Sequence, residues 1–271
     1  MTAPSRQGLS VNGTVTLPVM SPLLIRVVAG IVILGLWELG TRAFAAPFVA
    51  RPLNIIAAVP KVFADPAYWA ASLSTLSAVL LGLAIALVLG TLIGLVLGRI
   101  RGADRMLSFW VSSFYAMPMI AALPLLTVWF GFDEGARLAT IVFAALFSVV
   151  INVADGARST PAEYLEVGRS YRAKARHIWF DITLLSAVPY LIAGARLAAG
   201  RTLIGATLAE IYTAVDGLGY YILANARGLR QNEAFVGVLM LCFFGLVFEG
   251  LMVYALRRWF PWYRRDDEAA T

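Results

Sequence analysis

Six long apolar segments, separated by polar stretches, dominate the pattern of hydrophobic and polar positions along this chain. An α-helix needs about 20 apolar residues to cross the roughly 30 Å core of a membrane, and each segment is about that long. The segments are residues 25–45, 72–98, 106–130, 136–155, 184–211 and 234–256. None alternates with a period of two, which excludes a transmembrane β-barrel. The pattern predicts an all-α polytopic membrane protein with six transmembrane helices.

The composition supports this prediction and gives an orientation. Hydrophobic residues make up 60% of the chain and charged residues 14%, against about 45–50% and about 25% in soluble domains. The net charge of +6 comes from arginines scattered between apolar segments, which indicates membrane topology rather than nucleic-acid binding. A cytoplasmic N-terminus places most Lys and Arg residues inside. We therefore expect cytoplasmic tails at 1–22 and 259–271 and a first span with an external loop over 23–67. The two longest external connections are expected at 46–71 and 212–233.

A dense charged segment between Asp155 and Asp181 interrupts the apolar pattern. Hydrocarbon does not tolerate such charge, so residues 156–183 should form a loop outside the bilayer, on the cytoplasmic side. Thr160-Pro161-Ala162-Glu163 is typical of a helix start, with an N-cap threonine and a glutamate three residues later. The helical period puts apolar and small residues on one face and charges on the other. The first face has Tyr164, Val167, Gly168 and Tyr171, and the second has Glu163, Glu166 and Arg169.

Two of the predicted spans carry packing or bending signals. Small residues recur every four positions in the second span, and they permit the close approach of a helix from the same chain or from a second copy. They are Ser74, Ala78, Gly82, Ala86, Gly90, Gly94 and Gly98. The third span contains Met117-Pro118 and Leu123-Pro124, and prolines tend to kink helices. A kinked span either fits a curved bundle or lines a pathway.

Charges inside the spans are few: Glu38, Arg196, Arg201, Glu210 and Glu249. Each costs roughly 2.5–3.5 kcal/mol at the bilayer centre, so each should be paired, near an interface or facing a wet cavity. Glu210 lies on a stripe of small residues. It either forms a structural salt bridge or helix cap, or lies beside a translocation path. The candidates for a path or gate are Met117, Pro118, Pro124, Arg196, Arg201 and Glu210.

Motifs for chemistry are absent from the sequence. There is no GxxxxGK[ST] phosphate loop, and the single histidine, His177, and single cysteine, Cys242, form neither a metal-binding motif nor a nucleophile pair. We expect no catalytic, cofactor-binding or metal-binding residues in this chain. A membrane-embedded enzyme and a non-transporting membrane scaffold remain as alternatives to a transporter.

The charged loop resembles the signature of the inner-membrane permease subunits of ABC importers, which have the MetI-like type-1 transmembrane domain. The family pattern runs Glu-Ala-Ala-x-x-x-Gly and ends in Ile-x-Leu-Pro. In this sequence Glu166-Val167-Gly168 occupies the positions of Glu-Ala-Ala, and Arg172 occupies the position of the glycine. Ile182-Thr183-Leu184-Leu185 corresponds to the final Ile-x-Leu-Pro. Upstream, Met117-Pro118 through Trp129-Phe130-Gly131 is similar to the branch that imports nitrate, taurine and sulfonates. The permease domain so defined covers residues 68–258.

The resemblance implies a type I ABC importer fold and ATP-driven uptake of a small solute, such as a sulfonate, taurine or nitrate, by alternating access across a bacterial inner membrane. It also implies partners: a second permease copy as a homodimer, two cytoplasmic ATPase subunits that bind ATP and Mg, and an extracytoplasmic substrate-binding protein. In relatives this loop is the coupling helix that seats on the ATPase. The expected contacts are Glu163, Tyr164, Glu166, Val167, Gly168, Arg169, Tyr171 and Arg172.

Two positions depart from the family pattern. Arg172 replaces the turn glycine, and a left-handed conformation there would cost roughly 1–3 kcal/mol. Either the turn differs or this cost is accepted. Leu185 replaces a proline at a helix start, which leaves the onset of the fifth span less defined.

Overall fold

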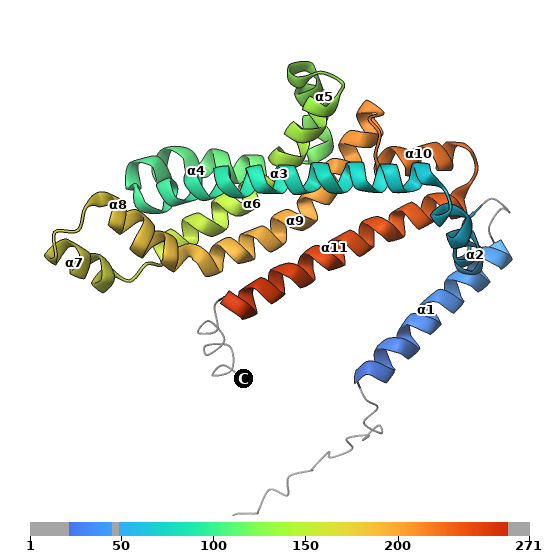
Figure 1. Cartoon of the computed structure of the whole chain (residues 1–271), viewed down its shortest axis with the longest axis horizontal. Coiled ribbons are helices and arrows are strands. Elements are labelled where there is room, and N and C mark those ends of the chain that lie inside the picture. The colour runs from blue at the N-terminus through green and yellow to red at the C-terminus, as the bar shows by residue number, and fades with distance from the viewer. Residues whose placement is uncertain (1–21, 45–48, 260–271) are drawn as a thin grey trace, which may run out of the picture. The chain divides into compact units, whose positions relative to one another are not determined.

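The computed structural model describes residues 22–44 and 49–259 (Figure 1). Throughout this part of the chain the elements are helices joined by short turns, which confirms the predicted all-α fold. Apart from Pro22 and Trp259, the predicted tails at 1–22 and 259–271 lie outside the described residues. The chain divides into two compact units, Met1–Leu53 and Asn54–Thr271, which are described separately below.

The first unit contains helix α1 (Pro22–Phe44) and the first residues of α2 (Pro52–Phe63). The charge of Glu38 within this apolar helix is satisfied locally. Its carboxylate accepts a hydrogen bond from Arg42 Nε at 2.6 Å and another from the backbone N–H of Leu53 at 3.1 Å. Glu38 is therefore paired, as expected for a charge inside a span.

Three long helices form the core of the second unit: α3 (Pro66–Arg99), α6 (Glu134–Arg158) and α9 (Leu185–Thr213). The small-residue stripe of α3 packs directly on α6. A Cβ added at Gly94 would lie 2.7 Å from Val153 Cβ, and one added at Gly90 would lie 2.6 Å from Val149 Cβ. The stripe therefore packs helices of the same chain, the first of the two alternatives that the sequence left open.

An adjacent face of α6 meets α9 through the same device. A Cβ added at Gly194 would lie 3.0 Å from Asn152 Cβ, and one added at Gly205 would lie 3.1 Å from Ala144 Cβ. Close approach on both faces explains why α6 is the central helix, with many residues that have almost no exposed surface.

The third predicted span is broken rather than merely kinked. Helices α4 (Arg101–Ala116) and α5 (Met119–Phe130) meet at Met117-Pro118 with a bend of 105°. Pro124 lies inside α5, which continues through it. Among the described residues, five helices are long and apolar enough to cross a membrane, or six if this bent pair is one span. The six predicted segments all correspond to these elements.

The two predicted external connections are mostly helical. Residues 46–71 contain α2 and the first turn of α3, where the Asp65 side chain accepts a hydrogen bond from Ala67 N at 2.9 Å and caps the helix. Residues 212–233 contain α10 (Leu218–Arg227), which packs against α11 (Gln231–Trp259). Prolines favour the first turn of a helix, and Pro52 and Pro66 each occupy such a turn, which explains why residues 46–71 are helical at these points.

Candidate functional site

The charged loop folds into three short helical pieces at one end of the bundle, with α10 at the other (Figure 1). They are α7 (Ala162–Ser170), α8 (Ala175–His177) and a π-helix, η1 (Ile178–Leu184), which runs directly into α9. The predicted N-cap is wrong. Thr160 is buried and its hydroxyl donates to the carbonyl of Ala157 at 3.0 Å, while Pro161 precedes α7 without a side-chain cap. Thr160 thus closes α6 instead of opening α7.

Arg172 adopts the left-handed conformation, with φ of 52°. Its N–H donates to the carbonyl of Arg169 at 2.9 Å, and the N–H of Ala173 donates to the carbonyl of Gly168 at 2.9 Å. These two bonds form a Schellman motif, which usually places glycine where Arg172 stands. The turn keeps the geometry that the family glycine would give, and the chain accepts the backbone cost.

One side of α7 packs on its own chain and the other is open. Leu165 and Gly168 are buried, and a Cβ added at Gly168 would lie 3.0 Å from Ile182 Cδ1 of η1. Tyr164, Val167 and Tyr171 are instead 59%, 56% and 84% exposed. Of the predicted apolar face, only Gly168 is buried against the rest of the chain, and the three larger side chains are mostly exposed.

The charges of α7 and its turn are also exposed and unpaired. Within the described residues none of them takes part in an ion pair, whereas the nearby Arg158 bridges Asp104 at 2.5 Å and Asp155 at 2.7 Å. Together with the three exposed apolar side chains they form what we call the α7 surface. It consists of Glu163, Tyr164, Glu166, Val167, Arg169, Tyr171 and Arg172.

A second candidate site lies at the break between α4 and α5. A cavity of about 150 Å³ opens there, and Met117 and Arg201 both line it. The Arg201 guanidinium carbon lies 4.0 Å from the ring centre of Tyr115, a cation–π contact. The other lining residues are Phe114, Met119, Phe143, Ala144, Phe147 and Ile204.

The remaining path candidates lie apart from this cavity. Pro118 marks the break and is exposed, and Pro124 is exposed on α5. Arg196 of α9 forms an ion pair with Glu249 of α11, and both side chains are about half exposed. The structure therefore brings together only Met117 and Arg201, next to Pro118.

Glu210 has no exposed surface and its carboxylate is fully engaged. Oε1 accepts from Thr75 Oγ1 at 2.8 Å, Oε2 accepts from the N–H of Gly219 at 2.8 Å, and Arg137 Nη1 lies 3.5 Å from Oε1. Gly217 packs so closely on the carboxylate that no side chain would fit there. This arrangement is a structural salt bridge. A role of Glu210 beside a pathway stays a prediction.

Arg137 is the residue that the sequence reasoning missed, because it was not counted among the charges inside the spans although it falls in the segment 136–155. It is 5% exposed and pairs with Glu134 at 2.5 Å as well as with Glu210. It also donates to Ser74 Oγ and to the carbonyl of Asp216, each at 2.9 Å. The spacing of Glu134 and Arg137 at i and i+3, in the first turn of a helix, was the available signal.

Residues 86–261 match the family described as the binding-protein-dependent transport system inner membrane component. The chain belongs to this family. The match covers the end of α3 from residue 86, the whole of α6 and α9, the broken span and the α7 loop.

The permease is similar to several bacterial transport permeases. It is 27% identical to the putative aliphatic sulfonates transport permease SsuC of Escherichia coli over 85% of this chain and 88% of that protein. It is 24% identical to the taurine transport permease TauC of E. coli over 84% and 85%. It is 23% identical to the formylaminopyrimidine transport permease ThiX of Halalkalibacterium halodurans over 78% and 85%. These relatives confirm the branch that the sequence resembles.

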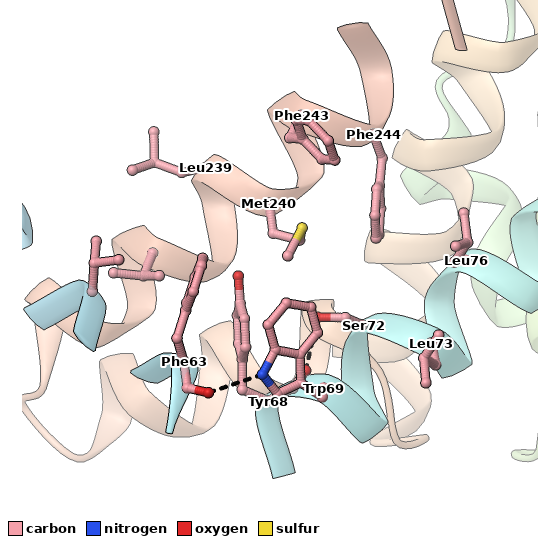
Figure 2. Close-up of a pocket in the computed structure, with 12 residues that line it drawn as sticks. Phe63, Tyr68, Trp69, Ser72, Leu73, Leu76, Leu239, Met240, Phe243 and Phe244 are labelled. Atoms are coloured by element: carbon pink, nitrogen blue, oxygen red, sulfur yellow. Dashed lines mark hydrogen bonds between the residues drawn. The ribbon is translucent and has the colours of Figure 1, made fainter. Parts of the chain in front are cut away.

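A larger cavity of the permease, about 540 Å³, has a different chemistry (Figure 2). It lies between α2, the start of α3 and α11, and its lining is aromatic and aliphatic apart from the polar atoms of Tyr68, Trp69 and Ser72. The Trp69 ring N–H is already used, because it donates to the carbonyl of Phe63 at 2.9 Å. No charged side chain lines this cavity, so it offers nothing to hold a charged solute.

Proposed function

We propose that this permease is the membrane subunit of an ATP-driven importer and that a separate ATPase subunit binds to the α7 surface. The observation that carries the proposal is the exposure of Tyr164, Val167 and Tyr171 on a helix flanked by unpaired charges. Burying apolar area on a partner is favourable by about 25 cal/mol per Å². Charges around such a patch fix the orientation of the partner.

The connection of α7 to the core also supports this role. Gly168 rests on Ile182 of η1, and η1 continues into α9 without a turn. A partner that moves α7 therefore acts directly on the helix that lines the cavity at Arg201. In this scheme two ATPase subunits bind ATP and Mg and a second permease copy completes a homodimer. The cavity then opens to each side alternately.

The remaining parts of the proposal concern the solute and the surroundings. The permease lies in a bacterial inner membrane with both termini in the cytoplasm, and it receives its solute from an extracytoplasmic binding protein. Relatives named for aliphatic sulfonates and for taurine favour a small organic anion. The chain itself carries no cofactor and performs no chemistry.

Purification of the tagged permease from its native membranes tests this proposal. We expect an ATP-hydrolysing subunit to copurify with the wild type. Glu166→Lys should weaken this association at least about tenfold, because it reverses a charge in the contact. Val167→Ala should weaken it by a smaller factor. Leu246→Ala is the control, since Leu246 of α11 is equally apolar and 70% exposed but lies outside the α7 surface.

Two results would contradict the proposal. The first is a wild-type permease that brings down no ATP-hydrolysing subunit. The second is a Glu166→Lys complex whose ATPase content and ATP-driven solute uptake both equal those of the wild type. Catalytic activity of the purified chain alone would instead support a membrane-embedded enzyme.

A further inference from the structure

Arg201 differs from three other arginines of the described spans, each of which has an acidic partner. Arg42 pairs with Glu38, Arg137 with Glu210 and Glu134, and Arg196 with Glu249. Arg201 forms no ion pair with any residue of the described part, and its guanidinium group lies over the ring of Tyr115. A charge inside a span is costly unless it is paired or faces a wet cavity. Arg201 therefore has its positive charge available for a ligand.

The position of Arg201 places this charge deep in the membrane. It lies twelve residues before Thr213, the end of α9, which corresponds to about 18 Å along a helix. A span crosses a core of about 30 Å, so Arg201 is near its middle. Residues from the middle of α6, such as Phe143 and Phe147, line the same cavity. Transporters commonly bind their solutes at this depth, next to a broken helix.

The cavity suits one kind of molecule. Arg201 is the only charged residue of its lining, and the wall is otherwise formed by aromatic and aliphatic side chains and by the phenol of Tyr115. The positive end of the α5 dipole lies at Met119, which is also part of the lining. A single cation in an apolar wall matches a solute with one anionic group and a short apolar portion.

We propose that Arg201 binds the anionic group of the transported solute as it passes the break between α4 and α5. This inference rests on the proposed importer function and adds the contact that selects the charge of the solute. Arg196 and Glu210 are then structural, because their charges are satisfied by Glu249 and Arg137. The solute class is a small organic sulfonate or carboxylate.

Direct binding to the purified full-length chain in nanodiscs tests the assignment without an ATPase. Ethanesulfonate serves as the anionic probe, and ethyl methyl sulfone as a neutral probe of similar shape. The measurement is the rise of the thermal unfolding midpoint with probe concentration, which reports binding to the folded state. We expect ethanesulfonate to stabilise the wild type and Arg201→Lys. Its affinity for Arg201→Gln should be about ten- to hundredfold lower. The neutral probe should not distinguish these proteins.

Two further variants separate a binding effect from a folding effect. Arg105→Gln removes an exposed arginine from α4, far along the helix from the cavity, and should bind ethanesulfonate like the wild type. Met119→Glu places a carboxylate in the lining and should lower binding of the anion by supplying Arg201 with an internal partner. Binding of ethanesulfonate to these two variants can be measured even if Arg201→Gln unfolds.

The outcomes distinguish this inference from the proposed function. Equal affinity of ethanesulfonate for the wild type and Arg201→Gln, or no binding to the wild type at all, overturns the role of Arg201. If the permease still copurifies with an ATPase, the importer assignment stands. Unchanged binding to Met119→Glu also counts against the site. If the permease binds the anionic probe selectively but recruits no ATPase, the anion site at Arg201 is supported and the proposed importer function is contradicted.

Discussion

Arg172 occupies a backbone position that normally selects glycine. Its positive φ is required by the two hydrogen bonds that end α7, from the N–H groups of Arg172 and Ala173. A residue with a Cβ pays about 1–2 kcal/mol for this conformation. The side chain is exposed, and no ion pair with the described residues offsets this cost.

We expect Arg172→Gly to stabilise the turn by up to about 1 kcal/mol, after allowing for the greater freedom of glycine in the unfolded chain. Hydrogen exchange at the amide of Ala173 should become slower, because that N–H bonds to Gly168 in the motif. Arg169→Gly is the control: it lies inside α7 and should speed exchange. Faster exchange in Arg172→Gly would mean that the arginine side chain stabilises the turn.

Single residues were the hardest part to predict from the sequence. The place of the family glycine left open whether the turn at Arg172 is left-handed, and the structure shows that it is. Arg137 was missed because a charge at the end of an apolar segment looks the same whether it faces water or folds back onto Glu210. Thr160 was assigned to the wrong helix because a threonine between two helices can bond to either. These choices depend on tertiary contacts that no local pattern contains.

At the scale of helices, packing in this permease depends on glycines that face a neighbouring backbone. Gly94 contacts Val153 and the carbonyl of Val150 on α6, with no space for a methyl group. Gly200 of α9 has no neighbouring atom within 4 Å of its would-be Cβ. The two glycines thus share a helical setting and differ in their surroundings.

Gly94→Ala should lower the stability of the permease by about 1–3 kcal/mol, because α3 and α6 must separate or shift. Gly200→Ala should be neutral or stabilising by up to about 1 kcal/mol, since alanine favours a helix. Unfolding of the two purified variants by increasing SDS measures this difference. A Gly94→Ala protein as stable as the wild type would show that the two helices adjust without cost.

The helices themselves were well predicted, and their geometry less so. Apolar length fixed six spans, and Met117-Pro118 marked the point where the third span breaks, because proline removes a backbone donor. The sequence did not predict a bend as large as 105°. The sequence analysis treated both external connections as loops and did not predict α2 and α10, although Pro52 and Pro66 stand at helix starts in the first connection.

For the whole molecule, the distribution of Lys and Arg predicts which end of the bundle faces the cytoplasm. In a Cys242→Ser background, Lys174→Cys beside α7 should react with an impermeant maleimide only from the cytoplasmic side. Arg227→Cys at the end of α10 should react only from the outside. Both positions are exposed. Labelling of Lys174→Cys in intact spheroplasts would show that the predicted orientation is wrong.

Glu210 and Arg137 have a consequence for motion. They tie α3, α6 and α9 together with the turn at Asp216, at the end of the bundle remote from α7. Sliding one of these helices past another would strand a buried carboxylate, at several kcal/mol. We therefore expect the three helices to tilt as a single rigid block when α7 is pushed. The break at Met117-Pro118 joins α4 to α5 outside this block, so we expect movement at that break to set how far the cavity can open.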